Sequence, residues 1–291
     1  MWSVMIPVHD CAHLLERLLP GVVSQLGERS DVHVEVVDDA STDDPSAVVD
    51  RLGGGIVTYR RNPVALGAAP NFNHCLRLSR GHLVHLLHGD DMVLPGFYDR
   101  MQEAWNDPSL VAVVCRTEYI DDADRPLTVT RPERAGSGIW QNALATMALS
   151  NRVRPPGIVV ARRAYETVGG FREDLPHAAD WEMWTRLAHA GPIWYVDDVL
   201  ARYRVHAESD TAGRIRSGAN IRERIEAIEA VNTLLPAPQR RPIARRAFGY
   251  SAVFAGRTAL RRLAARDFRT AAVQAREALR CLGRAAAPRI S

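Results

Sequence analysis

The sequence predicts an α/β fold, with a Rossmann-like, mainly parallel β-sheet flanked by helices and a C-terminal all-helical extension. Short apolar runs alternate with segments of helical spacing, and the apolar runs are apolar through their whole length, as in a sheet covered on both faces. After about residue 210 the pattern becomes entirely helical and rich in arginine. A chain of 291 residues, 46% of them apolar, can bury the core that such a fold requires.

The predicted strands are short apolar runs that end at polar or turn-forming residues. They span residues 3–8, 32–37, 56–60, 82–88, 110–116, 157–161 and 193–196. Helical spacing predicts helices between them, over residues 13–27, after 44, 70–80, 95–106, 139–150, before 169 and over 178–190. We interpret Asp43 and Asp44 as part of a turn that caps the second of these helices. The polar, aperiodic segment 121–138 is predicted to be a long loop.

Composition excludes several classes of site. The chain has no lysine, so a Walker-type phosphate loop, a Schiff base and a lysine nucleophile are excluded. Its four cysteines are scattered without a CxxC spacing, which argues against a zinc site or a disulfide framework. No apolar run has the length of a membrane-spanning helix, and the N-terminal residues do not resemble a secretion signal. We therefore expect a cytoplasmic protein, with peripheral membrane contact left open.

Adjacent carboxylates follow two of the predicted strands. Asp38 and Asp39 come after one of them, and Asp90 and Asp91 after another. Ligands bind to parallel sheets beyond the carboxyl ends of the strands. A divalent cation, Mn²⁺ or Mg²⁺, would neutralise Asp90 and Asp91, and Asp39 would accept hydrogen bonds from a base or a ribose. The alternative for Asp90 and Asp91 is an exposed turn or a helix cap.

Three more side chains suggest chemistry in the second half. Asp180 precedes a helix that carries Trp181 and Trp184, and it could accept a proton from a substrate hydroxyl, cap that helix, or do both. Beyond the last predicted strand, Arg204 suits a diphosphate, and His206 suits a metal or a phosphate oxygen.

Taken together, these segments resemble a known family. The segments are VMIPVHD, VVDDASTDD, RNPVALGAAPNFNHCLRLSRGHLVHLLHGDDMVLP, VVARRAYETVGGFREDLPHAADWEMWTRLAHAG and YRVH. Their order and spacing over residues 2–208 resemble family 2 glycosyltransferases of the GT-A fold. The resemblance implies inverting transfer of a sugar from a UDP-, GDP- or dTDP-linked donor to an acceptor. We expect residues 1–210 to form the GT-A domain, with a nucleotide-sugar half (1–116) and an acceptor half (117–210), and 211–291 to form an arginine-rich helical region.

The resemblance also implies a role for each motif residue. Asp180 would be the general base, and Arg204 would contact the diphosphate. The nucleotide would contact Pro7, Val8, His9, Asp39 and Asp90. The metal ligands would be Asp90, Asp91 and His206. We expect the acceptor, whose identity stays open between a glycan, a lipid-linked intermediate, a natural product and a protein, to contact Trp140, Trp181 and Trp184.

The chain departs from the family pattern at three places. His88 occupies the position of the first aspartate of the DxD motif, Ala179 replaces the usual acidic neighbour of Asp180, and His9-Asp10 replaces a tyrosine-asparagine pair. Two of these departures, His88 and Ala179, favour a rival reading as a catalytically silent module that binds a nucleotide-sugar or a partner. A nucleotidyltransferase would need a glycine-rich, basic loop after the first strand, which VHDCAHLL lacks.

The basic tail leaves further alternatives. Residues 240–291 hold 13 arginines and two acidic residues. Few aromatic residues interleave with the arginines and no recognition motif is present, so we expect no nucleic-acid partner. A basic amphipathic helix on anionic lipid is one alternative. We favour a helical pair that packs on the catalytic domain or on a second subunit through the apolar stripe Phe268, Ala272, Ala275, Leu279 and Leu282.

Overall fold

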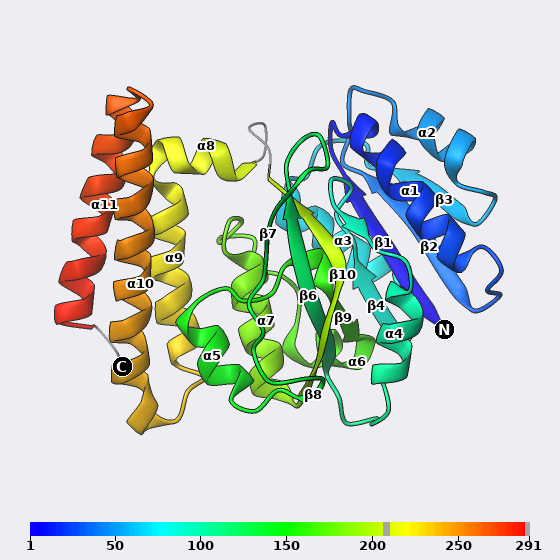
Figure 1. The fold of residues 1–291 in the computed structure, drawn as a ribbon. Coiled ribbons are helices and arrows are strands. Elements are labelled where there is room, and N and C mark those ends of the chain that lie inside the picture. The colour runs from blue at the N-terminus through cyan, green and yellow to red at the C-terminus, as the bar shows by residue number, and fades with distance from the viewer. Residues whose placement is uncertain (206–209, 289–291) are drawn as a thin grey trace. The chain divides into compact units, whose positions relative to one another are not determined.

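The computed structural model describes residues 1–205 and 210–288, and its elements are shown in Figure 1. The chain divides into two compact units. Unit 1 comprises Met1–Gln141, Val153–Phe171 and Ala190–Val205, and unit 2 comprises Asn142–Arg152, Arg172–His189 and His206–Ser291. This division differs from the expected boundary near residue 210, because two earlier segments group with the C-terminal helices.

Unit 1 is built on a mixed sheet. Within the described residues it has ten strands in the order β3-β2-β1-β4-β9-β6-β10-β5, with β7 beside β6 and β8 beside β10. The strands are β1 (Trp2–Val8), β2 (Val32–Asp38), β3 (Val57–Arg61), β4 (Leu83–Leu86), β5 (Met92–Val93), β6 (Ala112–Ile120), β7 (Pro126–Val129), β8 (Gly138–Ile139), β9 (Ile158–Ala161) and β10 (Ile193–Arg204). The pairs β1–β2, β1–β4, β2–β3 and β6–β10 are parallel, and they contain most of the paired residues of the sheet. The expected α/β architecture is therefore confirmed.

The segment predicted as a loop, 121–138, is partly strand. β7 pairs antiparallel with β6, and Gly138 begins β8, which pairs antiparallel with β10. All four residues of β7 are exposed, so the segment lacks the apolar signal of a buried strand. β10 is also longer than the predicted 193–196. A bulge after Val196 interrupts its apolar run, and the strand then continues to Arg204.

Helices cover both faces of this sheet (Figure 1). They are α1 (Ala12–Leu26), α2 (Pro45–Leu52), α3 (Ala68–Leu78), α4 (Phe97–Ala104), the 3₁₀ turn η1 (Pro155–Gly157) and α6 (Arg162–Val168). The even-numbered residues of β1 share one core with α1, α2 and α4, whereas α3 packs against β1 and β4. The capping prediction is confirmed for Asp44, which caps α2, while Asp43 accepts a hydrogen bond of 2.7 Å from the first amide of α1.

Unit 2 is all-helical in its described residues. Its helices are α5 (Ala143–Leu149), α7 (Ala179–Ala190), α8 (Asp210–Ser217), α9 (Ala219–Asn232), α10 (Ala237–Ala264) and α11 (Phe268–Ala286). A core that includes Trp181, Ile221, Phe248 and Cys281 joins α7, α9, α10 and α11. The predicted C-terminal helical extension is therefore present. No helix in residues 1–205 or 210–288 combines the length and apolar character that crossing a bilayer requires.

The apolar stripe of α11 does not pack as expected. Phe268, Ala272, Ala275, Leu279 and Leu282 are all exposed. The buried side of the helix carries instead Thr270, Ala271, Gln274, Glu277 and Cys281. Within this chain, therefore, the stripe is not what holds α11 in place.

Candidate functional site

Three strand ends of unit 1 are tied together by backbone hydrogen bonds. The amide of Asp39 donates to the carbonyl of Val8 at 2.9 Å, and the amide of Gly89 donates to the carbonyl of Pro7 at 3.1 Å. Gly89 permits the close approach, because a Cβ added there would lie 2.5 Å from Cγ1 of Val8. The turn after β4 therefore lies directly against the ends of β1 and β2, as the parallel topology predicts.

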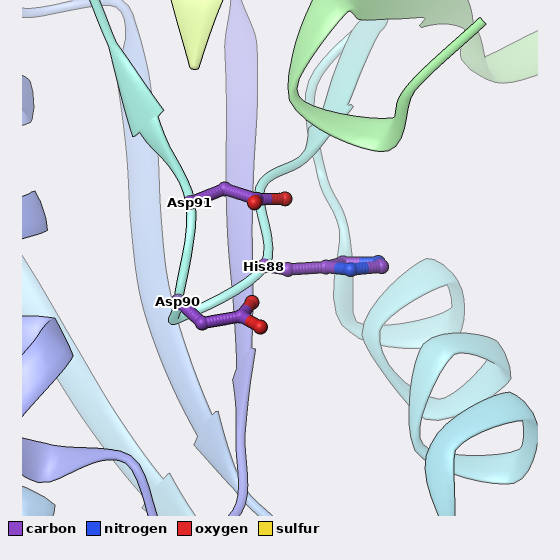
Figure 2. A group of neighbouring side chains, drawn as sticks. All are labelled: His88, Asp90 and Asp91. Carbon is purple, nitrogen blue, oxygen red and sulfur yellow. The ribbon is translucent and has the colours of Figure 1, made fainter. Parts of the chain in front are cut away.

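This turn gathers three metal-ligating side chains. One ligand atom each of His88, Asp90 and Asp91 lies within 4.8 Å of the other two, and the three side chains project to the same side of the turn (Figure 2). The His88 ring stacks on Phe72 with 4.6 Å between ring centroids. From the sequence, His88 stands where the family pattern has a carboxylate, and it was not among the predicted ligands. The signal was its position, two residues before Asp90.

Asp91 is the most constrained member of the group. It is 1% exposed. Its Oδ1 accepts a hydrogen bond of 3.0 Å from the backbone amide of Arg204, and its Oδ2 has no hydrogen-bond partner in the described part of the chain. Burial and the neighbouring Asp90 raise the pKa of Asp91 well above its usual value. An orphaned buried carboxylate oxygen beside a second carboxylate and an imidazole fits a divalent cation that prefers oxygen ligands.

In the structure, Arg204 binds other residues of the chain, although it was expected to contact a diphosphate. Its side chain is 1% exposed and forms an ion pair of 2.6 Å with Asp124. It also donates to the carbonyls of Asp90 at 2.9 Å and of Asp121 at 2.8 Å. These contacts occupy the guanidinium and join β10 to the acidic turn and to the 121–124 turn. The burial of Arg204 counts against direct contact with a diphosphate.

Arg154, for which no role was predicted from the sequence, is a second arginine, besides Arg204, whose charge bears on Asp91. This half-buried side chain lies over the rings of Tyr119 and Tyr203, at 5.6 and 5.8 Å from their centroids. Its Nε donates to the hydroxyl of Tyr119 at 2.5 Å. Its positive charge acts to lower the pKa of Asp91, against the larger effects of burial and Asp90.

Asp39 holds the loop that leads into α3. Its Oδ1 accepts from Asn62 Nδ2 at 2.9 Å and from the amide of Leu66 at 2.8 Å, and its Oδ2 accepts from the amide of Gly67 at 2.8 Å. Asn62 also donates to Asn71 at 3.0 Å. Contact between Asp39 and a base stays a prediction. No role was predicted for Asn62, whose signal in the sequence is its place between a strand and a proline.

The neighbouring Asp38 is buried in its own network. Ser41 donates through its amide and hydroxyl to Oδ1, at 2.8 and 2.5 Å, while Tyr59 and Arg61 each donate to Oδ2 at 2.6 Å. Burial opposes ionisation, but the hydrogen bonds from Ser41 and Tyr59 and the charge of Arg61 outweigh it, so the pKa of Asp38 lies below its usual value. Burial and Asp38 raise the pKa of Tyr59 to about 12.

The remaining residues predicted to contact the nucleotide or the metal are at the end of β1 and beyond β10. Pro7 and Val8 are buried at the end of β1, so a ligand would meet mainly their backbone. His9 is exposed, and its Nδ1 lies 2.9 Å from the carbonyl oxygen of Asp39. His206 lies outside the described residues.

Asp180 belongs to unit 2 and lies in the first turn of α7. It is therefore inside the helix rather than at the cap position before it. A carboxylate in the first turn still interacts favourably with the positive end of the helix dipole. Asn151 Nδ2 donates to its Oδ2 at 2.8 Å, and the amide of Trp181 donates to its Oδ1 at 2.6 Å. These bonds hold the half-buried carboxylate in a defined orientation, and its role as general base stays a prediction.

The tryptophans expected to contact an acceptor are packing residues in this structure. Trp140, Trp181 and Trp184 are 4, 2 and 1% exposed. Trp181 donates from its indole nitrogen to the carbonyl of Met147 at 2.5 Å and lies under the guanidinium of Arg224. Large aromatic rings with such contacts stabilise a core, and their burial counts against direct acceptor contact.

Sequence comparisons find proteins that are similar to this chain. The sequence model described as Glycosyl transferase family 2 matches residues 3–166. A protein of Mycobacterium tuberculosis described as uncharacterised is 29% identical over 233 residues, 76% of this chain and 72% of its own length. Chondroitin synthase of Escherichia coli is 23% identical over 226 residues, which are 73% of this chain but only 30% of that protein.

Solved structures give the same fold. A mannosyltransferase of Pyrobaculum calidifontis, in complex with GDP-Man and Mn²⁺, is 21% identical with a TM-score of 0.60, over 99% of this chain and 87% of that one. Residues 1–349 of TarS from S. aureus, in complex with UDP-GlcNAc, are 12% identical with a TM-score of 0.61, over 97% of this chain and 90% of that one. The likeness to these structures confirms the GT-A fold expected from the sequence.

Proposed function

Because this chain belongs to glycosyl transferase family 2, we propose that it transfers a sugar from a nucleotide-diphosphate donor to the hydroxyl group of an acceptor, with inversion at the anomeric carbon. The observation that carries the proposal is the acidic turn His88–Asp91, which the backbone bonds of Pro7 and Gly89 hold at the carboxyl edge of the sheet. Two carboxylates so close together, one of them buried, are stable where a cation and a diphosphate share the site.

A divalent cation fits this turn. His88, Asp90 and Asp91 would hold it, and when bound it would supply positive charge to the leaving diphosphate. Mn²⁺ and Mg²⁺ both suit the two carboxylates. The presence of Mn²⁺ beside GDP-Man in the similar mannosyltransferase supports this part of the proposal.

The other residues of unit 1 act on the donor. Arg154 would carry the positive charge expected of Arg204, since it is less buried than Arg204 and its charge also bears on Asp91. Arg204 would position the acidic turn rather than touch the diphosphate. Asp39 would fix the loop at Leu66 and Gly67 on which the base rests, and His9 and the backbone of Pro7 and Val8 would lie beside it.

Proton transfer is assigned to unit 2. Asp180 would accept the proton of the acceptor hydroxyl as its oxygen attacks the anomeric carbon from the face opposite the diphosphate, whose bond to that carbon breaks. Asn151 keeps one carboxylate oxygen occupied at 2.8 Å, so the orientation of the group is set before the acceptor arrives. No covalent enzyme intermediate is required.

A donor screen tests the function. Purified protein is incubated with UDP-, GDP- and dTDP-linked sugars and Mn²⁺, and release of the nucleoside diphosphate is measured with and without EDTA. We expect slow hydrolysis of one nucleotide class that EDTA stops and that Asp91→Asn abolishes. Release that is unaffected by EDTA would contradict the metal role. Equal release from Asp91→Asn would contradict the assignment of the site.

Two departures from the family pattern favour a second candidate, a catalytically silent module that binds a nucleotide-sugar. These are His88 in the metal group and the buried Ala179 beside Asp180. Such a module would bind one of the donor sugars, and this binding would raise its melting temperature. It would release a nucleoside diphosphate from none of the donors. The same screen therefore separates the two functions.

A further inference from the structure

The outer surface of the helical pair α10–α11 carries an apolar band. We define the apolar band as Val253, Leu260, Leu263, Phe268, Leu279 and Leu282. Leu260, Phe268 and Leu279 are 67, 65 and 69% exposed, which is unusual for side chains of this size. The two helices lie side by side along their length, joined by a short turn, with Leu263 and Phe268 on its two sides (Figure 1).

The band is exposed because α11 is held by its polar side. Gln274 Nε2 donates to the carbonyl of Ile215 at 2.7 Å and to Asn220 Oδ1 at 2.9 Å. Glu277, 1% exposed, pairs with Arg222 at 3.4 Å and with Arg280 at 3.1 Å. These bonds orient α11 within unit 2, so its apolar stripe is directed outward by specific contacts rather than by weak packing.

Arginines border the band on both helices. At about 100° per residue, Arg269, Arg276 and Arg280 lie about 80–120° around α11 from Phe268. By the same measure, Arg257 and Arg261 lie about 60–100° around α10 from Leu260. The long stems of arginine can lie along apolar surface while the guanidinium groups reach a polar layer.

The charge of this surface selects its partner. Asp267 and Glu277 are the only acidic residues from 240 to 291, and Glu277 is buried. If a second copy covered the band, the arginine borders of both copies would meet. Glu277 pairs with Arg276 and Arg280 of its own chain, but it does not balance Arg257, Arg261 and Arg269 as well, and like charges repel. Phosphates of a nucleic acid would pair with the arginines but would not bury the leucines. An interface that is apolar in the middle and negative at the rim is the surface of an anionic lipid bilayer.

We propose that the apolar band and its bordering arginines bind unit 2 to the surface of anionic membranes. The six apolar side chains enter the boundary between head groups and acyl chains, and the arginines contact the lipid phosphates. This binding is peripheral and needs both parts, apolar burial and charge. It does not depend on the glycosyl transfer proposed above.

The test is flotation of the full chain with vesicles of phosphatidylcholine alone or of phosphatidylcholine mixed with phosphatidylglycerol. We expect binding to the anionic vesicles, weakened by salt. Leu279→Glu should weaken it at least about tenfold, because it removes apolar burial. Arg257→Gln and Arg269→Gln should each weaken it about fivefold, the effect of one arginine near a charged bilayer. Circular dichroism checks that each variant is folded.

Matched controls are available in unit 1. Leu127 in β7 is 56% exposed, so Leu127→Glu makes the same chemical change at a similar exposure away from the band. Arg131→Gln removes an exposed arginine there. Both variants should bind like the wild type.

Three outcomes would overturn the proposal. The first is no binding to anionic vesicles, or equal binding to neutral ones. The second is a dimer in sedimentation velocity that Leu279→Glu dissociates while no vesicle binding is seen, which would make the band a contact between copies. The third is vesicle binding that duplex DNA displaces and Leu279→Glu leaves intact, which would show arginines binding phosphate without the band.

Discussion

The backbone amide of Arg204 donates a hydrogen bond of 3.0 Å to Oδ1 of Asp91, and so links the last residue of β10 to the acidic turn after β4. The two residues are 113 positions apart in the sequence. The side chain of Arg204 reinforces the link through the carbonyl of Asp90 and the carboxylate of Asp124. The geometry of the candidate metal group thus depends on a strand that contributes no ligand to it.

We first predict that Arg204→Met destabilises the protein and loosens the metal group. The variant leaves Asp124 without its partner, and breaking such a pair costs about 3 kcal/mol. Chemical denaturation should show this loss, and titration with Mn²⁺ should give a weaker affinity. Arg202→Met is the control. Arg202 lies on the same strand as Arg204 and pairs with Glu118, but it is more exposed. An Arg204→Met variant with wild-type stability and Mn²⁺ affinity would contradict this positioning role.

Asp91→Asn should stabilise the metal-free protein at neutral pH. The raised pKa of Asp91 means that folding disfavours its ionised form. This carboxylate therefore lowers the stability at pH values above its ordinary pKa, and the loss grows as the pH rises toward the raised pKa. Asparagine keeps Oδ1 for the amide of Arg204 and removes the charge. A higher melting temperature without metal is the expected result.

The same variant should lose its response to metal. A ligand at a hundredfold excess over its Kd stabilises a protein by about 2.7 kcal/mol. Mn²⁺ should therefore raise the melting temperature of the wild type and of Asp50→Asn, an exposed control, but not that of Asp91→Asn or Asp90→Asn. A full Mn²⁺ response in Asp91→Asn would place the cation elsewhere.

Asp180→Asn should abolish transfer while leaving donor binding intact. Asparagine can still accept the hydrogen bond from the Trp181 amide, but it cannot take a proton, and loss of a general base costs about a hundredfold or more in kcat. Donor affinity by calorimetry should stay unchanged. Glu226→Gln, an exposed change in the same unit, should behave like the wild type. Near-normal kcat in Asp180→Asn would refute the assignment.

Asp38 should make a pH-dependent contribution to stability. Its folded pKa lies below the ordinary value, so its contribution is complete above that value and is lost as the pH falls through the lowered folded pKa. Asp38→Asn should therefore cost about 2 kcal/mol at pH 7, from hydrogen bonds to a charged group. The difference from the wild type should shrink below about pH 4, as urea denaturation at several pH values would show. A cost that stays constant across this range would mean that the charge of Asp38 is not what its partners stabilise.

Much of unit 1 could be predicted from local patterns. Apolar runs and helical spacing located most of the sheet, and the paired carboxylates after two strands located the candidate site. The pairing of β7 was not predictable, because its four residues are exposed and polar contacts with β6 define it. The second half of β10 was missed because a bulge interrupts its pattern.

The roles of single side chains were harder to predict than the elements that carry them. Arg204 and Trp181 were expected to meet ligands, yet both are buried by residues distant in the sequence. His88 is a departure from the family motif in the sequence, yet it lies within ligand distance of Asp90 and Asp91. A motif gives the type and order of residues, but it does not say which of their atoms are already occupied by hydrogen bonds.

The sequence by itself determined the α/β class, the positions of most strands along the chain and the acidic residues at their carboxyl ends, because each of these follows from residues close together in the chain. Only the tertiary structure decided which face of α11 is exposed, which arginine near Asp91 is only half-buried, and which carboxylate oxygen has no donor in the described part of the chain. The physical reason is that burial and hydrogen bonding are settled by contacts between distant segments. Gln274 and Glu277 hold the polar face of α11 inward, although its apolar stripe alone indicates the reverse.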